Sequence, residues 1–309
     1  MQSPSQYPSS FIRKSRKSAP ELFKTRGVTL EAFPISGTVV PDHPEFSEHW
    51  HRFVEIGIII GGTGLHVING RDVPIHSGHV FVLPPELKHA YRETEGLHLI
   101  NICYDPARLQ LDEKELDDLP GYNALFHFEP RLRSYGELEH MLKLEPAELC
   151  RIESLALKIV HESRKQPKGY RMMARAFVFQ LIAELSRLFD KPYSAPNALV
   201  QRLAGAIKHL ESHSQEEIDF DKLPQAFHFS KRSFYRLFSA ATGQSPLAYL
   251  RIYRLQQAYR LLQESGKSVT EIAYEVGFQN SSHFSRRFQE LFGHPPSHFQ
   301  NQKLAIRGR

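Results

Sequence analysis

Hydrophobic and polar residues alternate with different periods in different parts of the chain. Between about residue 27 and Tyr104, short apolar runs end at turn residues; the clearest are VEIGIII (54–60), LHVI (65–68), VFVL (80–83) and LHLINICY (97–104). Asn69 and Gly70 follow the second run, and Asn-Gly between alternating residues is the strongest short signal for a β-hairpin. Short strands spaced in this way predict an antiparallel barrel or sandwich.

A helical period takes over after an irregular stretch with some helix at residues 107–145. Apolar positions recur every three to four residues from Pro146 to about Ser163 and from Tyr170 to Phe189, with QPKG (166–169) between them. The second helix carries Met173 and Phe177 on one side, together with Leu181, Leu185 and Leu188. This predicts a helical hairpin with more apolar surface than it can cover itself, so we expect it to pack on the barrel or to form a homodimer seam. DKPYSAPN (190–197), with two prolines, is typical of a linker.

The last third of the chain contains an internal repeat with a constant offset of fifty residues. FYRLFSAATGQSPLAY (234–249) aligns without a gap to FSRRFQELFGHPPSHF (284–299), and five positions are identical: Phe234/Phe284, Arg236/Arg286, Phe238/Phe288, Gly243/Gly293 and Pro246/Pro296. Ser230 and Asn280 keep the same offset, and each is a good N-cap. We infer a duplicated helix-turn-helix unit.

The second helix of each unit combines a buried stripe with an exposed polar face. Phe234, Leu237 and Phe238 form the first stripe, and Phe284, Phe288 and Leu291 form the second. The exposed faces then carry Arg232, Tyr235 and Arg236 in one unit, and Ser281, Ser282, Ser285 and Arg286 in the other. Such helices can enter the DNA major groove, where arginine reaches guanine and hydroxyl groups reach other base edges.

An unbroken helical pattern from Pro246 to Glu264 joins the two units. A helix of this length spans about 29 Å, which suits two recognition helices set roughly one 34 Å DNA turn apart. Lys222, Arg251 and Arg254 are candidate phosphate contacts, although ordinary surface charge explains each of them equally well.

The net charge of +5 conceals an uneven distribution. Residues 1–26 carry +5, residues 27–196 carry −6, and residues 197–309 carry +6. A basic last third favours a polyanionic partner, and the acidic middle favours another task. The basic N-terminal segment contains scattered Ser and Pro, so we expect a disordered tail. Only two cysteines, no apolar run of membrane-spanning length and no export signal together predict a cytoplasmic protein that spans no membrane.

The repeat resembles the AraC/XylS family of bacterial transcription regulators. SVTEIAYEVGFQNSSHFSRRFQELFGHPPSHF (268–299) matches the family's signature almost throughout, and SKRSFYRLFSAATGQSPLAYLRIYRLQQA (230–258) is similar to its first unit and linker helix. The resemblance covers about residues 199–300. It implies base or phosphate contacts from Arg232, Tyr235, Arg236, Ser281, Ser282, Ser285 and Arg286. Pro224 stands where the family usually has Ala, so we expect a shifted helix start there. His283 also departs, standing where the family often has Tyr.

Histidines and a glutamate cluster in the strand region. On an extended strand His49, His51 and Glu55 share a face, and His89 follows two hairpins later. Together they offer three imidazole nitrogens and a carboxylate inside a barrel, which suit iron, manganese, nickel or zinc. The same groups, with Trp50 or Tyr91, suit the hydroxyl groups of a polyol, or else they are satisfied hydrogen-bonding groups of the core.

The spacing of these residues looks like the two cupin motifs, with departures at His43, Glu86 and Glu93. In AraC-like regulators, such a barrel resembles an effector-binding domain without catalysis. HWHRFVEIGIIIGGTGLHVING (49–70) and PGYNALFHFEPRLR (120–133) resemble the L-rhamnose-responsive members.

The resemblance therefore implies a regulator that binds double-stranded DNA in a sequence-specific way. It implies that the protein is a homodimer and activates transcription together with RNA polymerase. It responds to a small-molecule effector, a sugar by this resemblance, held by His49, His51, Glu55 and His89 without a metal or cofactor. Two alternatives stay open: a metal-binding cupin enzyme fused to a DNA-binding head, and a repressor with a vestigial barrel.

The expected fold class is multidomain α+β, with a cupin-like β-barrel and helical hairpin followed by an all-α pair of helix-turn-helix units. The expected divisions are a disordered basic tail (1–26), a cupin-like effector-binding domain (27–145), a dimerisation hairpin (146–189), a linker (190–198), an AraC-type double helix-turn-helix domain (199–301) and a tail (302–309).

Overall fold

The computed structural model describes residue 30 and residues 33–111, 116, 119–138, 141–191 and 195–300. Within these ranges the chain forms two compact units that divide between Gln201 and Arg202. The expected tails at residues 1–26 and 302–309 lie outside the described residues. No helix in the described ranges is long and apolar enough to cross a membrane.

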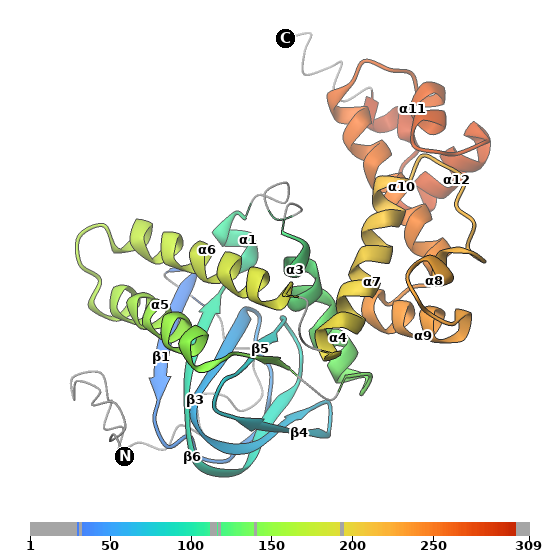
Figure 1. The fold of residues 1–309 in the computed structure, drawn as a ribbon. Helices are drawn as coiled ribbons and strands as arrows, with labels where there is room; N and C mark the ends of the chain where they lie inside the picture. Colours follow the sequence, from blue (N-terminus) through green and yellow to red (C-terminus); the bar gives the residue numbers. More distant parts are fainter. Residues whose placement is uncertain are drawn as a thin grey trace. The chain divides into compact units, whose positions relative to one another are not determined.

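The first unit is built on a seven-stranded sheet in which every pair of strands is antiparallel (Figure 1). Its strands are β1 (Ile35–Val40), β2 (Phe46–His49), β3 (Val54–Ile68), β4 (Arg71–His76), β5 (His79–Leu83), β6 (His89–Tyr104) and β7 (Leu142–Lys143). The order is β1-β6-β3-β5-β7, with β2 paired to β6 and β4 paired to β3. This confirms the predicted fold class for the first part of the chain.

Two strands are longer than the apolar runs predicted. β3 continues through Gly61 and Gly62, and β6 begins eight residues before the run at 97–104. The glycines do not end the strand, because the β3–β6 register shifts there and the ladder resumes. Such bulges bend a strand without breaking it. The predicted Asn69-Gly70 hairpin turn is present, with both residues at positive φ between β3 and β4.

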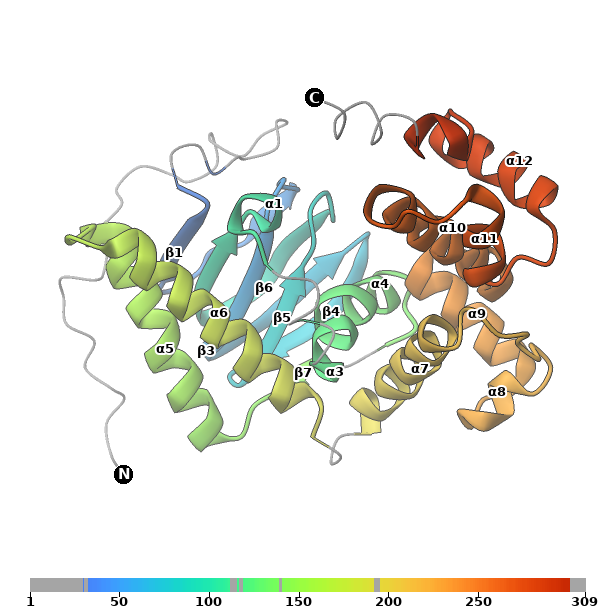
Figure 2. The same cartoon turned by 90° about the horizontal axis from the view of Figure 1, so that it is seen from above.

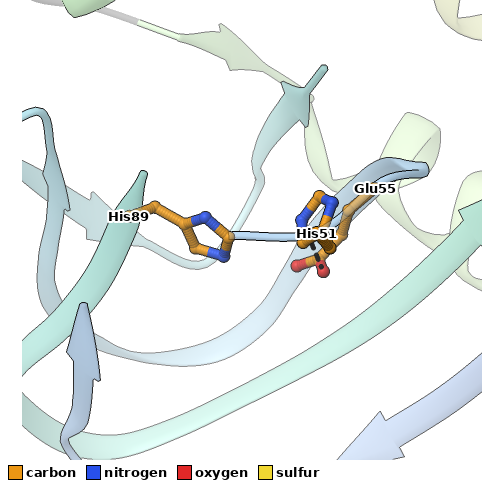
Figure 3. A group of neighbouring side chains, drawn as sticks. All are labelled: His51, Glu55 and His89. Carbon is orange, nitrogen blue, oxygen red and sulfur yellow. Dashed lines mark ion pairs between the residues drawn. The ribbon is translucent and has the colours of Figure 1, made fainter. Parts of the chain in front are cut away.

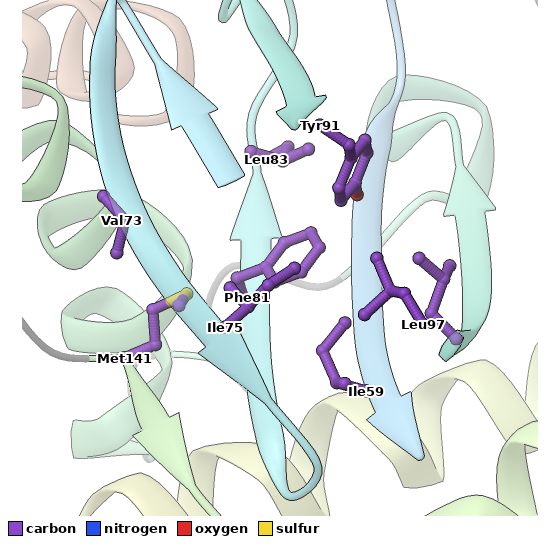
Figure 4. Close-up of a cluster of buried hydrophobic side chains, with 9 residues drawn as sticks. Ile59, Val73, Ile75, Phe81, Leu83, Tyr91, Leu97 and Met141 are labelled. Carbon is purple, nitrogen blue, oxygen red and sulfur yellow. The ribbon is translucent and has the colours of Figure 1, made fainter. Parts of the chain in front are cut away.

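Apolar side chains from four strands fill the interior beside this bend (Figure 4). They alternate along each strand, so that one face of the sheet is dry. The cluster contains Ile59, Val73, Ile75, Phe81, Leu83, Tyr91, Leu97, Leu99 and Met141.

Helices cover one side of the sheet (Figure 2). Short helical segments follow β6: α1 (Pro106–Leu109), α3 (Pro120–Tyr122), the π-helix η3 (Asn123–Phe128) and α4 (Glu129–Ser134). The hairpin helices α5 (Pro146–Lys165) and α6 (Tyr170–Phe189) follow, close to the predicted bounds. α5 packs on β1 so closely that a Cβ on Gly37 would lie 2.9 Å from the Val160 Cα. A glycine is therefore needed there.

The buried face of α6 differs from the prediction. Ala174 and Val178 are buried together with Leu181 and Leu185. Met173 is 43% exposed, so placing it on the buried side was wrong. The helix is apolar on more than one side, and close packing against α5 selects the smaller side chains for the contact.

The described part of the second unit contains helices and no strands. Its helices are α7 (Ala195–Ser212), α8 (Leu223–Ala226), α9 (Lys231–Thr242), α10 (Pro246–Glu264), α11 (Val269–Glu275) and α12 (Ser281–Phe292). α7 already begins at Ala195, so the expected linker at 190–198 is too long at its C-terminal end. The Ser230 and Asn280 side chains cap α9 and α12 as predicted, each accepting a hydrogen bond from a backbone N–H three residues on.

The duplicated stripes are buried, with one exception. Phe234, Phe238, Phe284 and Phe288 are all fully buried. Leu291 is 41% exposed, so its assignment to the stripe was wrong. Pro224 lies in the first turn of α8, where a proline is tolerated, and α8 is four residues long.

Candidate functional site

Three polar side chains converge in the interior of the first unit (Figure 3). His51 lies between β2 and β3, Glu55 is the second residue of β3, and His89 is the first residue of β6. One ligand atom from each lies within 4.8 Å of the others, and all three residues are buried. The His51 Nε2 and Glu55 Oε2 atoms are 3.5 Å apart. The structure therefore brings together three of the four residues expected to form the effector site.

Backbone carbonyls fix how the two imidazoles face this space. The Nδ1 atom of His51 lies 2.8 Å from the Phe53 carbonyl, and that of His89 lies 3.1 Å from the Leu87 carbonyl. A carbonyl oxygen only accepts hydrogen bonds, so each neutral imidazole carries its hydrogen on Nδ1 and a lone pair on Nε2. Both Nε2 atoms are buried and lack a hydrogen-bond partner among the described residues.

Burial sets the charge of the cluster. Desolvation lowers the pKa of His51 to about 4 and holds the pKa of His89 well below its ordinary value. Desolvation also raises the pKa of Glu55 to about 7, although the Cys103 thiol donates to its carboxylate. At neutral pH the imidazoles are therefore uncharged, and Glu55 is partly protonated.

His49 lies beside these three residues. The chain leaves the strand conformation between His49 at the end of β2 and Val54 at the start of β3. Regular alternation along one strand is therefore not what brings His51 and Glu55 together. His49 is only partly buried, with its ring 4.1 Å from that of His89. It therefore borders the cluster.

Two further residues belong to the same interior: Tyr91, which the sequence had suggested as a partner of the cluster, and His66, which it had not. His66 on β3 is fully buried, and neither of its ring nitrogens has a hydrogen-bond partner among the described residues. It stacks on Tyr91, its cross-strand partner, at 4.9 Å; the Tyr91 hydroxyl is also buried without such a partner. The rings of His66 and His89 are 5.7 Å apart. His66 stands alone in an apolar run, and a single histidine there does not indicate a binding site in the sequence.

This set of atoms can do two things chemically. Two imidazole nitrogens and a carboxylate suit a divalent zinc, iron, manganese or nickel ion with open coordination positions. The larger set, with His66 and Tyr91, offers neutral hydrogen-bond acceptors and donors to a ligand that carries several hydroxyl groups.

The polar faces of α9 and α12 lie at the surface of the second unit. On α9, Arg232 and Arg236 are exposed and Tyr235 is partly buried. On α12, Ser282 and Arg286 are exposed, while Ser281 and Ser285 are partly buried. The buried phenylalanines hold the opposite faces. The structure therefore presents both predicted reading faces outward.

The three candidate phosphate contacts differ in their surroundings. Arg254 donates from Nε to the Ser214 carbonyl and from Nη2 to the Glu216 carbonyl, so its guanidinium is engaged inside the unit. The ammonium of Lys222 lies 3.3 Å from Asp219. Arg251 lines a groove together with Arg286.

Comparison with known proteins identifies both parts of the chain. Residues 41–166 match the family described as an AraC-like ligand binding domain, and residues 223–302 match a helix-turn-helix domain family. The HTH-type transcriptional activator RhaS of Escherichia coli O1:K1 is 30% identical over 274 residues, covering 87% of this chain and 94% of the relative. The same protein from strain E24377A is 30% identical over 276 residues, with the same coverage.

Solved structures resemble about a third of the chain. The DNA-binding domain of the transcriptional factor AdpA, in complex with a target DNA, is 31% identical; the match covers 35% of this chain and 97% of that one, with a TM-score of 0.33. An AraC-type regulator from Chromobacterium violaceum is 29% identical, covering 33% and 91%, with a TM-score of 0.32.

Proposed function

Because the chain belongs to the AraC family of transcription regulators, we propose that it is an activator controlled by a small neutral carbohydrate bound in its first unit. The family consists of DNA-binding regulators with a ligand-binding domain, so the chain is a regulator and not an enzyme. A regulator of this kind acts where the DNA is, which is the cytoplasm of a bacterium.

One observation carries the effector proposal: buried polar atoms that lack partners among the described residues lie on neighbouring rings in the interior of the first unit. They are His51 Nε2, both ring nitrogens of His66, His89 Nε2 and the Tyr91 hydroxyl. Each such atom costs about 1–3 kcal/mol while it is unpaired, and a bound ligand recovers that cost. The neutral imidazoles offer no charge to an anion, so they favour a neutral molecule with several hydroxyl groups.

Calorimetric titration of the purified chain with a panel of monosaccharides tests this proposal. L-Rhamnose leads the panel because the sequence resemblance implies it. We expect one sugar to bind saturably to the wild type and not to His66→Phe, which keeps the ring stacking but removes both nitrogens. His98→Phe, a change in a partly exposed histidine on β6, is the matched control. Binding that survives in His66→Phe contradicts the proposed pocket.

Metal binding is the second candidate, favoured by the approach of His51, Glu55 and His89 to within 4.8 Å. Those three side chains would hold the ion, which would supply a Lewis acid for ligand hydroxyl groups. Metal analysis of protein purified without chelators distinguishes the two. If the wild type retains a stoichiometric metal and Glu55→Gln does not, the site binds a metal and the metal-free proposal is wrong.

We propose that α9 and α12 enter successive major grooves of double-stranded DNA. Arg232, Tyr235 and Arg236 from α9, and Ser281, Ser282, Ser285 and Arg286 from α12, would contact bases or phosphates. Their outward faces and the family's function support this assignment. Effector binding would shift the population of states that can engage both half-sites or RNA polymerase.

The helical hairpin supports a homodimer. Met172 and Phe179 on α6 are 77% and 40% exposed, and such exposed apolar residues on a helix are typical of an interface. The double variant Met172→Arg, Phe179→Arg should sediment as a monomer if α6 forms the seam. Gln180→Arg, an exposed change on the same helix, is the control for added charge alone. An unchanged dimer in the double variant places the seam elsewhere.

A further inference from the structure

Arg254 makes a two-point contact between segments far apart in the second unit. It lies in the middle of α10, and its guanidinium reaches the loop that joins α7 to α8. Nε donates to the Ser214 carbonyl at 2.5 Å, and Nη2 donates to the Glu216 carbonyl at 2.7 Å. This loop leads directly into α8 and α9, which form the first helix-turn-helix unit.

Gly277 lies in the turn between α11 and α12 of the second helix-turn-helix unit and packs against the same loop. Its φ is +90°, and a Cβ there would lie 2.8 Å from the Ser214 oxygen, 2.9 Å from the Gln215 oxygen and 3.0 Å from the Arg254 Cζ. Only glycine fits this approach. The loop 214–216, Arg254 and Gly277 therefore form one packed junction, which we call the brace.

The brace lies next to the face that we propose reads DNA. Gln215 and Glu216 of the loop line a groove in the second unit together with Ser282 and Arg286 of α12. Arg254 also lines this groove. The loop that precedes α8 and α9 is therefore held beside the start of α12 by the Arg254 guanidinium and by the close packing of Gly277.

We propose that Arg254 is a positioning residue for DNA recognition, fixing the separation of α9 and α12 so that both meet their half-sites at one spacing. The inference rests on the proposed contact of both helices with DNA. Arginine suits the task because its planar fork satisfies two carbonyls at once. Lysine keeps the charge but presents a single flexible ammonium, so the spacing should loosen in Arg254→Lys.

The test uses the full chain and a DNA duplex selected from a random-sequence library by the wild-type protein. Derived duplexes carry one or two inserted base pairs between the half-sites, or one scrambled half-site. Fluorescence anisotropy measures the dissociation constant of each. Wild type should bind the two-pair insertion at least about tenfold more weakly than the selected duplex, because half of its base contacts lose register.

Arg254→Lys should bind the selected duplex about tenfold more weakly, lose much less on insertion, and bind the single half-site as wild type does. Arg260→Lys, the same substitution at an exposed arginine of α10, is the matched control and should behave as wild type. The readout is the dependence on spacing, which a general loss of stability or of a phosphate contact would not change.

Three results would overturn the proposal. Equal weakening on every duplex, including the single half-site, would make Arg254 a phosphate contact. If neither Arg254→Lys nor Arg254→Gln shows a cooperative unfolding transition when heated from 25 °C, Arg254 is needed only for folding. Wild-type spacing dependence in Arg254→Lys would show that the brace does not set the separation. If instead wild type binds one half-site as tightly as two, the proposed reading by both helices fails.

Discussion

The two units of the chain place their polar side chains in opposite surroundings. In the first unit His51, His66 and His89 are buried, with ring nitrogens that lack partners among the described residues. In the second unit Ser282 and Arg286 project from a helix whose other face is held by fully buried phenylalanines. A small ligand is recognised when it is enclosed and desolvated, whereas DNA is recognised by side chains that reach outward.

Acidification should affect the first unit most strongly. Desolvation holds the pKa values of His51, His66 and His89 below their ordinary value of 6.5, so stability is complete above that pH and is lost as the pH falls. The free energy of unfolding should therefore decrease from pH 7 to pH 5. Each imidazole contributes at most about 1.4 kcal/mol per pH unit.

Glu55 works in the opposite direction and sharpens this prediction. Its pKa rises from 4.5 to about 7, so its contribution is lost as the pH rises through that range. Glu55→Gln should therefore steepen the acid dependence by up to about 1.4 kcal/mol per pH unit. Urea unfolding followed by fluorescence reports on the first unit, because the chain's single tryptophan, Trp50, lies there. A shallower dependence in the variant contradicts the assigned pKa of Glu55.

The arginines of the reading helices should carry specific DNA binding. Arg236→Ala and Arg286→Ala should each cost about 1–3 kcal/mol of specific affinity if the side chains contact bases. Anisotropy with a selected duplex and a scrambled duplex measures the specific part, and Arg260→Ala is the control. If both variants retain wild-type affinity, the assignment of the reading faces is wrong.

His66→Phe should separate function from stability in the first unit. Removing two buried nitrogens that lack partners among the described residues should raise the free energy of unfolding, by about 1–3 kcal/mol for each nitrogen, while sugar binding is lost. Thermal unfolding of the variant and of His98→Phe measures the gain. Destabilisation of His66→Phe alone would indicate that His66 is a satisfied core residue.

The smallest effect is expected at a helix cap in the second unit. The Ser268 hydroxyl accepts from the Glu271 N–H, and the Glu271 carboxylate accepts from the Ser268 N–H, which completes a capping box on α11. Ser268→Ala should cost about 1 kcal/mol of stability, measured by urea unfolding. Ser265→Ala, at the C-terminal end of α10, is the comparison for a serine whose hydroxyl donates to a helix carbonyl and does not cap a helix start. DNA affinity at 25 °C should not change.

The sequence predicted the second unit better than the first for a physical reason. Because the repeat has a constant offset, each structural position is seen twice in the sequence. Helix caps and buried stripes also depend on neighbouring residues only, so the roles of Ser230, Asn280 and Phe284 could be assigned directly. The prediction for Leu291 was wrong because periodicity alone does not show where along a helix the packing against the core ends.

The interior of the first unit depends on contacts between distant segments. His89 joins His51 only through strand pairing, and His66 has no local pattern that marks it. The strand is interrupted between His49 and Val54, so alternation along one strand does not describe how His51 and Glu55 meet. The brace at Arg254 was likewise invisible, because its partners are backbone carbonyls forty and thirty-eight residues away.

Transcription in vitro tests the central claim most directly. A promoter template carrying the selected DNA site, RNA polymerase and the monosaccharide panel are combined with wild type, His66→Phe or His98→Phe. We predict that one sugar raises transcript yield with wild type and His98→Phe, and that His66→Phe binds the site but gives only the sugar-free yield. Equal sugar responses from wild type and His66→Phe would contradict the claim that this buried cluster is the effector site.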